Sequence, residues 1–461
     1  MTNLSGTSLN NGSAVGPQGE DRDSPSRFPK YPAYKDSGGE WIGDIPDHWS
    51  ANPLKRAFKI EGGSTPTPDE VNWDGDIAWV TPADLSGLSS LFLDASKRTI
   101  TATGLASCGT TLLPAGSLIL STRAPIGSLA IALIRVCTNQ GCKGLVPNAD
   151  ASSAYFAYVL LTAKAELNNR GKGTTFLEIS GDELGRFVVP TPPFPEQTQI
   201  ARFLDHETAR IDALIEEQQR LIELLKEKRQ AVISHAVTKG LDPTVPMKDS
   251  GVEWLGEVPA HWDVLPVWML FQMGRGRVIS HDEIAENSGD YPVYSSQTER
   301  DGVMGSINTY DFEGDYLTWT TDGANAGTVF RRSGKFNCTN VCGTLLPKRK
   351  DDDLRYFVDA VGICTAAFIR HDINPKLMNN VMASIKVPAP PLMEQTAIAA
   401  YVSAFKDKET VLIQEAFTGI SLLQERRSAL ISAAVTGKID VRGWQPPASI
   451  QAPEPAVAEA V

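Results

Sequence analysis

The sequence contains two copies of one pair of motifs, and this duplication restricts the possible folds more than any other feature. The motif KDSGGEWIGDIPDHW at Lys35–Trp49 recurs as KDSGVEWLGEVPAHW at Lys248–Trp262. The motif VPTPPFPEQTQIARFL, which begins at Val189, recurs as VPAPPLMEQTAIAAYV from Val387, and the likeness continues well beyond it. The chain is therefore a tandem duplication of one unit of roughly 200 residues.

Between the repeated motifs lie two segments, 50–188 and 263–386, which are related but strongly diverged. Both contain short apolar or β-branched runs separated by Gly, Pro and Asp, a pattern typical of strands and turns. Each also has a stretch of helical periodicity, at 154–167 and 354–367. Matching short motifs indicate that the second copy has lost residues mainly before Gly327. We expect two compact mixed α/β domains that present different surfaces on a shared scaffold.

A long helix is predicted after each variable segment, because a Pro-Pro pair is followed by apolar residues at helical spacing. A single helix over 196–239 would be about 66 Å long, and a helix of that length with one apolar stripe needs a partner. Its own duplicate is the obvious candidate, so we predict that the two helices pair as an antiparallel coiled coil. The candidate residues for helix pairing and subunit interaction are Ile211, Leu214, Leu221, Leu225, Leu412, Ile413, Leu423 and Leu430.

The predicted fold is thus α+β (mixed), with two α/β domains separated by long helices. Both ends of the chain are rich in small residues and Pro and are expected to be disordered, since they cannot bury enough apolar surface. The start lacks the basic and apolar regions of a signal peptide, and no apolar run is long enough to span a membrane, so we expect a cytoplasmic protein. The predicted order is a tail (1–29), a variable domain (30–188), a helical segment (189–247), a second variable domain (248–386), a second helical segment (387–443) and a tail (444–461).

No catalytic constellation is apparent. Thr191-Pro192-Pro193-Phe194 is similar to a catalytic motif of adenine methyltransferases, but its repeat at 389–392 keeps only the prolines, and no Gly-rich AdoMet loop precedes it. His48 and His261 stand beside Trp49 and Trp262 at equivalent places, which favours packing over catalysis. The six cysteines include no Cys-x-x-Cys pair, so we interpret them as buried free thiols. A zinc site from 137/142 and 338/342 would need irregular spacings and is disfavoured.

The repeated motifs resemble those of the specificity (S) subunits of type I restriction–modification systems. The resemblance is carried by KDSG-x-EW-[IL]-G-[DE]-[IV]-P-x-HW, and by the Pro-Pro-x-x-Glu-Gln helix that ends in Ser-x-Ala-Val-Thr; it covers about residues 30–443. It implies two target-recognition domains that each read one half of a split sequence in double-stranded DNA. The paired helices would act as the spacer and dock two modification subunits.

The same resemblance implies a non-catalytic chain without a cofactor or metal of its own. AdoMet would be bound by the modification (methyltransferase) subunits, and ATP and Mg by restriction subunits that translocate and cut DNA.

Bases are read by side chains that reach the major groove, while phosphate contacts position the protein. We therefore expect the readers in polar loops between strands, although each could equally stabilise a turn. In the first domain the candidates are Thr81, Asp84, Thr122, Arg123, Asn139, Gln140 and Lys143. In the second they are Ser295, Ser296, Gln297, Thr321, Asp322, Asn325 and Asn340, with Arg331 and Arg332 as candidate phosphate contacts.

The formal net charge of -12 over 461 residues argues at first against a nucleic-acid partner. The acidity is uneven, however: residues 50–188 carry 12 basic and 12 acidic side chains, and 263–386 carry 13 and 16. The charge therefore does not exclude DNA, but it predicts that the chain alone binds DNA weakly. A coiled-coil scaffold that binds only proteins is the alternative hypothesis.

Overall fold

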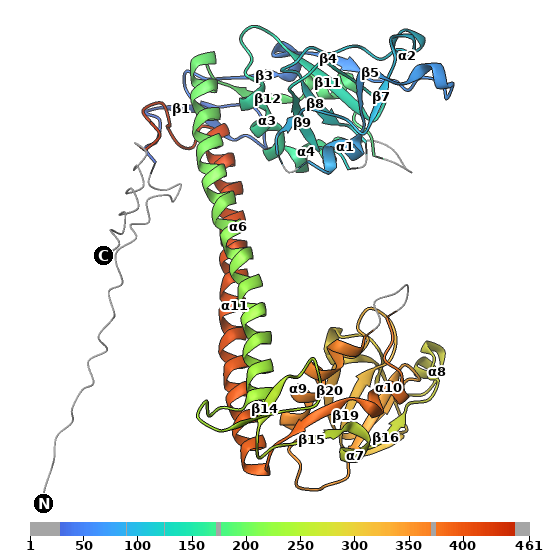
Figure 1. Cartoon of the computed structure of the whole chain (residues 1–461). Coiled ribbons are helices and arrows are strands. Elements are labelled where there is room, and N and C mark those ends of the chain that lie inside the picture. The colour runs from blue at the N-terminus through green and yellow to red at the C-terminus, as the bar shows by residue number, and fades with distance from the viewer. Residues whose placement is uncertain (1–27, 89, 124, 172–176, 370–374, 448–461) are drawn as a thin grey trace, which may run out of the picture. The chain divides into compact units, whose positions relative to one another are not determined.

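The structure is a computed structural model that describes residues 28–88, 90–123, 125–171, 177–369 and 375–447. The chain divides into two compact units, of which the first combines 1–217 with 419–461 and the second is 218–418. Each unit holds one variable domain and parts of both long helices (Figure 1). The mixed α/β fold with long paired helices is confirmed. Within the described residues, no helix is long and apolar enough to cross a membrane.

In the first unit, a five-stranded sheet with the order β4-β11-β8-β9-β6 packs beside a three-stranded sheet, β10-β5-β7. Two small antiparallel pairs, β1-β2 and β3-β12, connect the domain to the helices. The strands are β1 (Tyr34–Asp36), β2 (Asp44–Pro46), β3 (Ser50–Pro53), β4 (Phe58–Gly62), β5 (Trp73–Val80), β6 (Phe92–Leu93), β7 (Arg98–Ile100), β8 (Leu118–Ser121), β9 (Leu129–Ala132), β10 (Val136–Thr138), β11 (Cys142–Pro147) and β12 (Val188–Thr191). The helices are η2 (Leu54–Arg56), η3 (Glu70–Asn72), α1 (Pro82–Ser86), α2 (Ala102–Ser107), α3 (Ser153–Thr162), α4 (Lys164–Asn169) and α5 (Gly181–Arg186).

In the second unit, one six-stranded sheet has the order β16-β21-β19-β20-β17-β18. The small pairs β13-β14 and β15-β22 repeat those of the first unit. The strands are β13 (Met247–Asp249), β14 (Glu257–Pro259), β15 (Asp263–Pro266), β16 (Phe271–Arg275), β17 (Ser288–Tyr294), β18 (Val303–Ile307), β19 (Phe312–Thr320), β20 (Val329–Cys338), β21 (Cys342–Pro347) and β22 (Lys386–Ala389). The helices are α7 (Val267–Leu270), α8 (His281–Glu286), η4 (Glu299–Gly302), α9 (Leu354–Thr365), η5 (Ala366–Phe368) and α10 (Asn379–Ser384).

The two sheets of the first unit correspond to the single sheet of the second. Strand β20 runs without a break, whereas residues 133–135 separate its counterparts β9 and β10. The parallel pairing of β5 with β10 is repeated by that of β17 with β20. The connection from β5 to β8 (81–117) is longer than that from β17 to β19 (295–311), so the shortening of the second copy lies before Gly327, as the sequence predicts.

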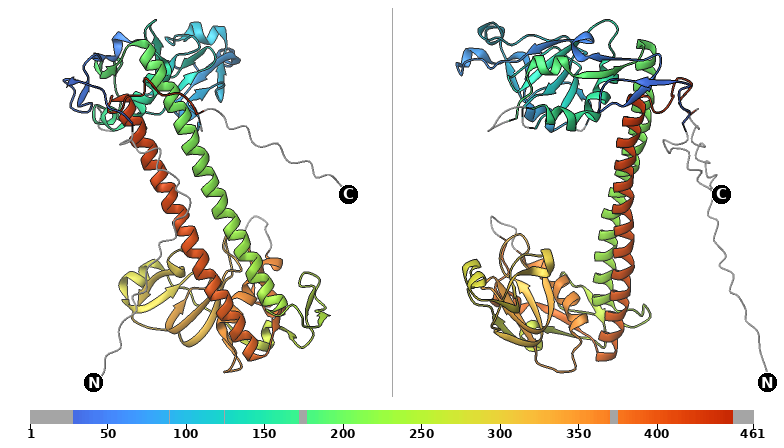
Figure 2. Two further views of the ribbon diagram at one scale, coloured as in Figure 1. Left: turned by 90° about the vertical axis from the view of Figure 1, so that its left-hand side faces the viewer. Right: turned by 180° about the vertical axis from the view of Figure 1, so that it is seen from behind.

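The two long helices are α6 (Phe194–Lys239) and α11 (Leu392–Val435). In each unit their segments lie side by side and antiparallel (Figure 2). Arg427 pairs with Asp212 at 2.8 Å in the first unit, and Arg229 pairs with Glu409 at 3.4 Å in the second. Burial along α11 recurs every seven residues, which is the period of a coiled-coil seam. The residues of this period are Val402, Glu409, Ala416, Leu423 and Leu430.

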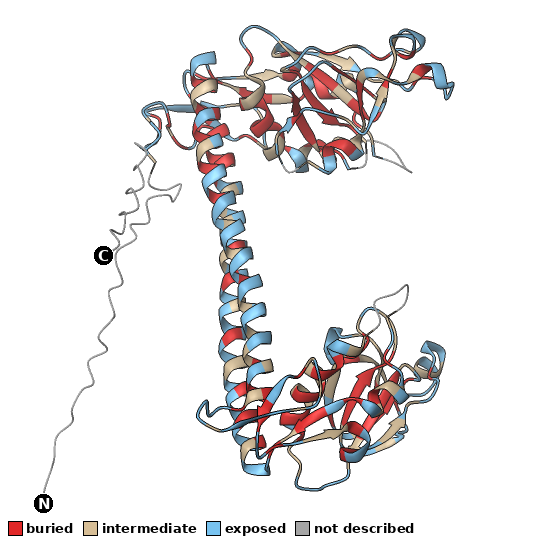
Figure 3. Cartoon of the chain, in the orientation of Figure 1, coloured by how far each residue is buried: buried red, intermediate tan, exposed pale blue. Residues whose placement is uncertain are grey.

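Three of the residues predicted for helix pairing and subunit interaction do not lie in the seam between the helices, because Leu214, Leu221 and Leu412 are 38%, 42% and 41% exposed. As residues for interaction with other subunits they stay predictions. On α6 the seam passes instead through their neighbours Ile215 and Ile222. Figure 3 shows that buried stretches alternate with exposed ones along the long helices. Two apolar rows lie next to each other on these helices, and only one of them faces the partner helix. The remaining predicted residues, Ile211, Leu225, Ile413, Leu423 and Leu430, are buried or half-buried.

The repeated motifs meet where each domain joins its helix. The carboxylate of Glu196 accepts hydrogen bonds from Tyr31 Oη (2.6 Å) and Trp49 Nε1 (3.1 Å) and pairs with His48 Nε2 (2.8 Å). Glu394 repeats the contacts with His261 (2.6 Å) and Trp262 (2.9 Å) in the second unit. Burial raises the pKa of Tyr31, so its hydroxyl remains a donor. Both histidines thus make a polar contact that joins the domain to its helix.

Each domain also holds the end of the helix that comes from the other repeat. Tyr155 donates to the carbonyls of Pro190 and Val435, both at 3.2 Å. Tyr356 makes the equivalent bonds to Pro388 and Val237, both at 3.1 Å. Each compact unit is therefore built from both sequence repeats.

The predicted tails, 1–29 and 444–461, lie mostly outside the described residues. At their inner ends, Phe28 and Trp444 both make edge-on contacts with the ring of Phe203, with centroids 5.2 and 5.3 Å away. The amide of Asp440 donates to the carbonyl of Pro29 at 2.7 Å. The folded part thus extends slightly further at both ends than predicted, because single aromatic side chains there complete the core.

Candidate nucleic-acid interface

Three loops meet at one end of the first domain: the residues after β5, the residues after β8, and the turn from β10 to β11. The amide of Asn139 donates to the carbonyl of Val80 at 3.0 Å, and that of Thr122 donates to Gly141 at 2.8 Å. The loops therefore form one surface, and all seven predicted readers of this domain lie on or beside it.

The second domain brings together the equivalent loops. The amide of Thr339 donates to the carbonyl of Tyr294 at 2.9 Å, and that of Thr321 donates to Val341 at 2.9 Å. Both domains thus present a three-loop surface at the same place in the fold, with different side chains.

Several predicted readers of the first domain serve the fold itself. Thr81 and Asp84 form a capping box at the start of α1, and Asp84 also accepts from the amide of Lys97 at 3.0 Å. The side chain of Thr122 is buried and donates to Gly141 at 3.3 Å. Asn139 accepts from the amide of Gly141 at 3.0 Å and closes the turn. These side chains shape the loops, so we do not retain them as base contacts.

Three other side chains of this surface reach solvent. Gln140 is exposed, and its amide oxygen accepts from Thr65 Oγ1 at 2.5 Å. Arg123 is half-buried and pairs with Glu178 at 3.0 Å. Lys143 is also half-buried, and it makes no ion pair with any described residue. Gln140 and Arg123 stay as predicted readers of the first half-site, and Lys143 stays a predicted DNA contact.

In the second domain the loop after β17 is held by its own polar groups. Gln297 donates to the carbonyl of Val303 at 2.5 Å, the Ser295 hydroxyl accepts from the amide of Gln297 at 3.5 Å, and Asn325 donates to the carbonyl of Ser296 at 3.3 Å. Thr321 is buried and donates to Asp322 at 2.7 Å.

Asp322 pairs in turn with Lys376 at 3.6 Å. Asn340, at the tip of the turn from β20 to β21, is exposed. It therefore remains the clearest predicted reader of this domain.

Arg332 is not the phosphate contact that the sequence suggests, because its side chain is only 1% exposed. Its guanidinium lies between the rings of Tyr294 (3.7 Å) and Phe330 (4.4 Å) and pairs with Asp301 at 2.6 Å. Asp301 and its neighbour Arg300 both have left-handed backbone, with φ of 57° and 48°. Arg331, in contrast, is exposed and pairs with Asp315 at 3.5 Å.

Sequence reasoning missed Arg275, which donates from Nε to the carbonyl of Asn340 at 2.7 Å. It lies on β16, opposite Gly343, and not in a loop. The pairing of the strand ends was the signal that could have identified it, because a side chain beside a turn can reach the same surface as the turn.

No group of three or more potential metal ligands occurs among the described residues. All six cysteines are free, and five of them are buried. Burial raises the pKa of Cys137 and of Cys142 to about 12, so both thiols are protonated at neutral pH. Such thiols are packing groups and poor metal ligands.

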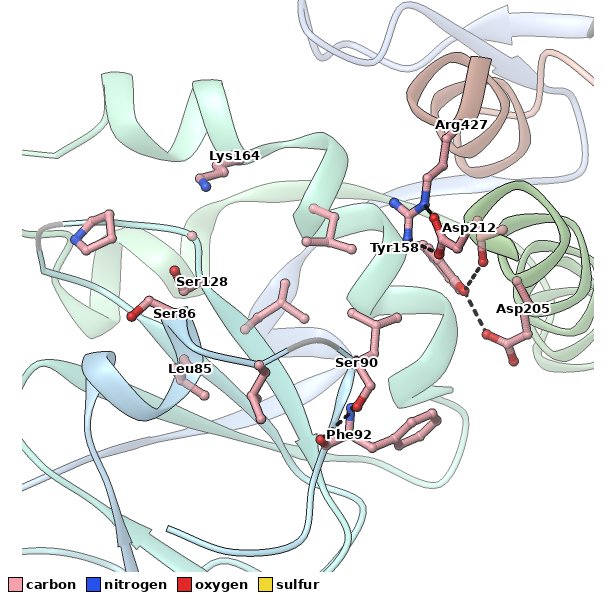
Figure 4. A pocket seen from close by; sticks show the side chains of 18 residues that line it. Leu85, Ser86, Ser90, Phe92, Ser128, Tyr158, Lys164, Asp205, Asp212 and Arg427 are labelled. Atoms are coloured by element: carbon pink, nitrogen blue, oxygen red, sulfur yellow. Dashed lines mark hydrogen bonds and ion pairs between the residues drawn. The ribbon is translucent and has the colours of Figure 1, made fainter. Parts of the chain in front are cut away.

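A groove of about 790 Å³ lies between the first domain and its helices (Figure 4). On its helical side Tyr158 donates to Asp205 at 2.8 Å, and Arg427 pairs with Asp212. The equivalent contact in the second unit joins Asp359 and Lys406 at 2.5 Å. Polar contacts thus hold each domain against its own helix pair.

Comparison with known proteins agrees with this organisation. The family profile described as "Type I restriction modification DNA specificity domain" matches twice, at residues 46–225 and 259–416. The MjaIX specificity subunit of a type I restriction enzyme from Methanocaldococcus jannaschii is 35% identical over 188 residues, which are 40% of this chain and 43% of that protein. The putative type I specificity subunit S.MpnORF507P of Mycoplasma pneumoniae is 42% identical over 143 residues, or 31% of this chain and 39% of that protein. The matches thus span about two fifths of the length of these curated relatives.

Two solved structures share the fold at 14% sequence identity. One comes from work on complex assembly and conformational transition of the type I R-M system; it covers 85% of this chain and 98% of its own, with a TM-score of 0.67. The other is the HsdS subunit from Thermoanaerobacter tengcongensis, which covers 86% and 98% with a TM-score of 0.53. With two matches of the family profile over most of its length, the chain belongs to the type I restriction–modification DNA specificity family.

Proposed function

We propose that this chain is the sequence-specific DNA-recognition subunit of a type I restriction–modification complex. The observation that carries the proposal is the repeated three-loop surface, one in each diverged domain on a duplicated scaffold. Each domain would read one half of a bipartite site, and the helices would set the spacing between the halves. The chain itself would be non-catalytic and act in the cytoplasm.

The proposed partners are double-stranded DNA, two modification subunits that bind AdoMet, and restriction subunits that bind ATP and Mg. Exposed apolar side chains on the long helices support the docking of other subunits, since apolar surface is costly to leave in water. These side chains are Leu214, Leu221, Leu224, Val411, Leu412, Phe417 and Leu422.

Exchange of residues 50–188 for the corresponding domain of another family member tests the proposal. The complex with modification subunits should then methylate a site with one new half and one unchanged half. Long-read sequencing of modified adenines gives both halves and the spacer together. An unchanged target after the exchange would contradict the proposal.

The alternative, a coiled-coil scaffold that binds only proteins, predicts no sequence-dependent DNA binding by the assembled complex. A gel-shift assay on random duplexes distinguishes the two. The membership of the DNA specificity family favours the recognition subunit.

A further inference from the structure

A second groove, with a volume of about 680 Å³, lies on the first domain beside the three-loop surface. Its apolar floor includes Phe58 and Ile60. Four cationic side chains line it, and they come from four different elements: Lys55 on η2, Lys59 on β4, Lys143 on β11 and Arg186 on α5.

The cations outnumber the anions in this groove. Among the described residues that line it, Asp182 is the one acidic side chain, and Lys59 pairs with Glu61 nearby at 2.6 Å. Within the described part of the chain, Lys55, Lys143 and Arg186 make no ion pair. Unpaired cations that converge on a concave surface attract an anionic ligand.

The second domain has none of these four cations at the equivalent positions. The pairing of Phe58 with Pro147 corresponds to that of Phe271 with Pro347, so Gln272 and Gly343 replace Lys59 and Lys143. The bond from the amide of Leu54 to Phe187 corresponds to that from Val267 to Ile385. This second correspondence places Trp268 and Ser384 where the first domain has Lys55 and Arg186. Arg275 stands at the place of Gly62, but its guanidinium is bound to Asn340.

We infer that the basic groove binds the sugar–phosphate backbone of the DNA that flanks the first half-site, and that the second domain does not repeat this set of four contacts. The groove adjoins the proposed base-reading surface: Lys143 is the second residue of β11, the strand that follows the turn at 139–141, and the amide of Ser64, just beyond β4, donates to the carbonyl of Thr138 at 3.0 Å. A duplex held by the three loops would continue over these cations. The inference rests on the proposed function.

The test measures DNA binding by the complex of the full chain with modification subunits, from 50 to 300 mM salt. In the variant Lys55→Gln/Arg186→Gln, the slope of log affinity against log salt should become shallower by about 1 to 2, since each phosphate contact contributes ~0.9. The methylated sequence should not change. The control Lys30→Gln/Lys438→Gln removes two exposed cations elsewhere in the same unit and should leave the slope as it is.

A reverse variant keeps the test independent of any loss of folding. Gln272→Lys/Ser384→Arg builds two groove cations into the second domain and should steepen the salt slope by about 1 to 2. Duplexes with uncharged methylphosphonates beside one half-site locate the contact. Methylphosphonates beside the first half-site should lower the affinity of the complex with the parent chain and should not change the affinity of the complex with the groove variant.

Three results would overturn the inference. One is an unchanged slope in the groove variant, and another is a changed methylated sequence, which would make the groove a base reader. The third is weaker assembly with modification subunits at an unchanged slope, which would make it a protein-docking site. Failure of the parent complex to methylate any defined sequence would instead refute the proposed function.

Discussion

At the scale of single residues, Glu196 is the most heavily used polar side chain in the junction between domain and helix. It is 7% exposed, and three neighbours bind its carboxylate. Glu196→Gln keeps the shape but loses the charge, and hydrogen bonds to charged groups are worth about 1.5–3 kcal/mol each. We expect the free energy of unfolding of this unit to fall by about 2 kcal/mol in urea titrations. The matched change Glu394→Gln should cost less than 1 kcal/mol, because that carboxylate is 40% exposed and solvent screens it. Equal losses would contradict the argument.

Arg332 contributes to the position of the loop at 295–302 through its ion pair with Asp301, and its removal tests that role within the proposed function. The buried guanidinium holds Asp301 in a left-handed conformation that costs about 1–3 kcal/mol for a residue other than Gly. Arg332→Met fills the same space between the rings without the ion pair, so the loop is released while the sheet remains. Adenine mapping should then show a degenerate second half-site and an unchanged first one. Arg331→Met, which removes an exposed cation next to it, should alter neither half-site.

The loops that hold the candidate readers show which features of the site can be predicted from the sequence and which cannot. The sequence predicts that readers lie in polar loops between strands, and the structure brings these loops together at one end of each domain. The sequence does not predict which side chains face outward. Thr122 and Thr321 follow buried strand residues and turn inward, and Asp84 is used by a helix cap. These outcomes depend on the pleat and on local hydrogen bonds, which a single sequence does not display.

At the scale of elements, the long helices pair through a seam that contains a buried carboxylate. Glu409 is 3% exposed, and both of its oxygens lack a hydrogen-bond partner among the described residues, although Arg229 Nε lies 3.4 Å away. Desolvation of an ion pair often costs more than the pair returns. Glu409→Leu should therefore stabilise the second unit by about 1 kcal/mol or more, whereas Arg229→Leu should destabilise it by about 3 kcal/mol, because it leaves the carboxylate alone. Thermal unfolding of the two variants checks the opposite signs; destabilisation by both would contradict the prediction.

Helical periodicity alone does not predict which apolar residues form the seam between the two long helices. Leu214 and Ile215, like Leu221 and Ile222, are adjacent apolar residues, and a period of 3.6 accommodates either row. The location of the partner helix decides between them. The sequence predicts the helix and its partner, and the tertiary contacts select the face.

At the scale of the whole molecule, the folding units do not coincide with the sequence repeats. The second unit is one continuous stretch, 218–418, whereas the first needs 419–461 in addition to 1–217. The core of the first unit includes Leu430 and Val435, and Tyr155 donates to the carbonyl of Val435.

We therefore expect the fragment 218–418 to unfold cooperatively by itself. The fragment 1–217 should lack fixed tertiary packing until a peptide of residues 419–447 is added. Near-ultraviolet circular dichroism during titration with that peptide measures the effect, and a peptide with Leu430→Asp should fail to restore the signal because it buries a charge in the core. If the fragment 1–217 unfolded as sharply without the peptide as it does with the peptide, the end of α11 would not belong to the first folding unit.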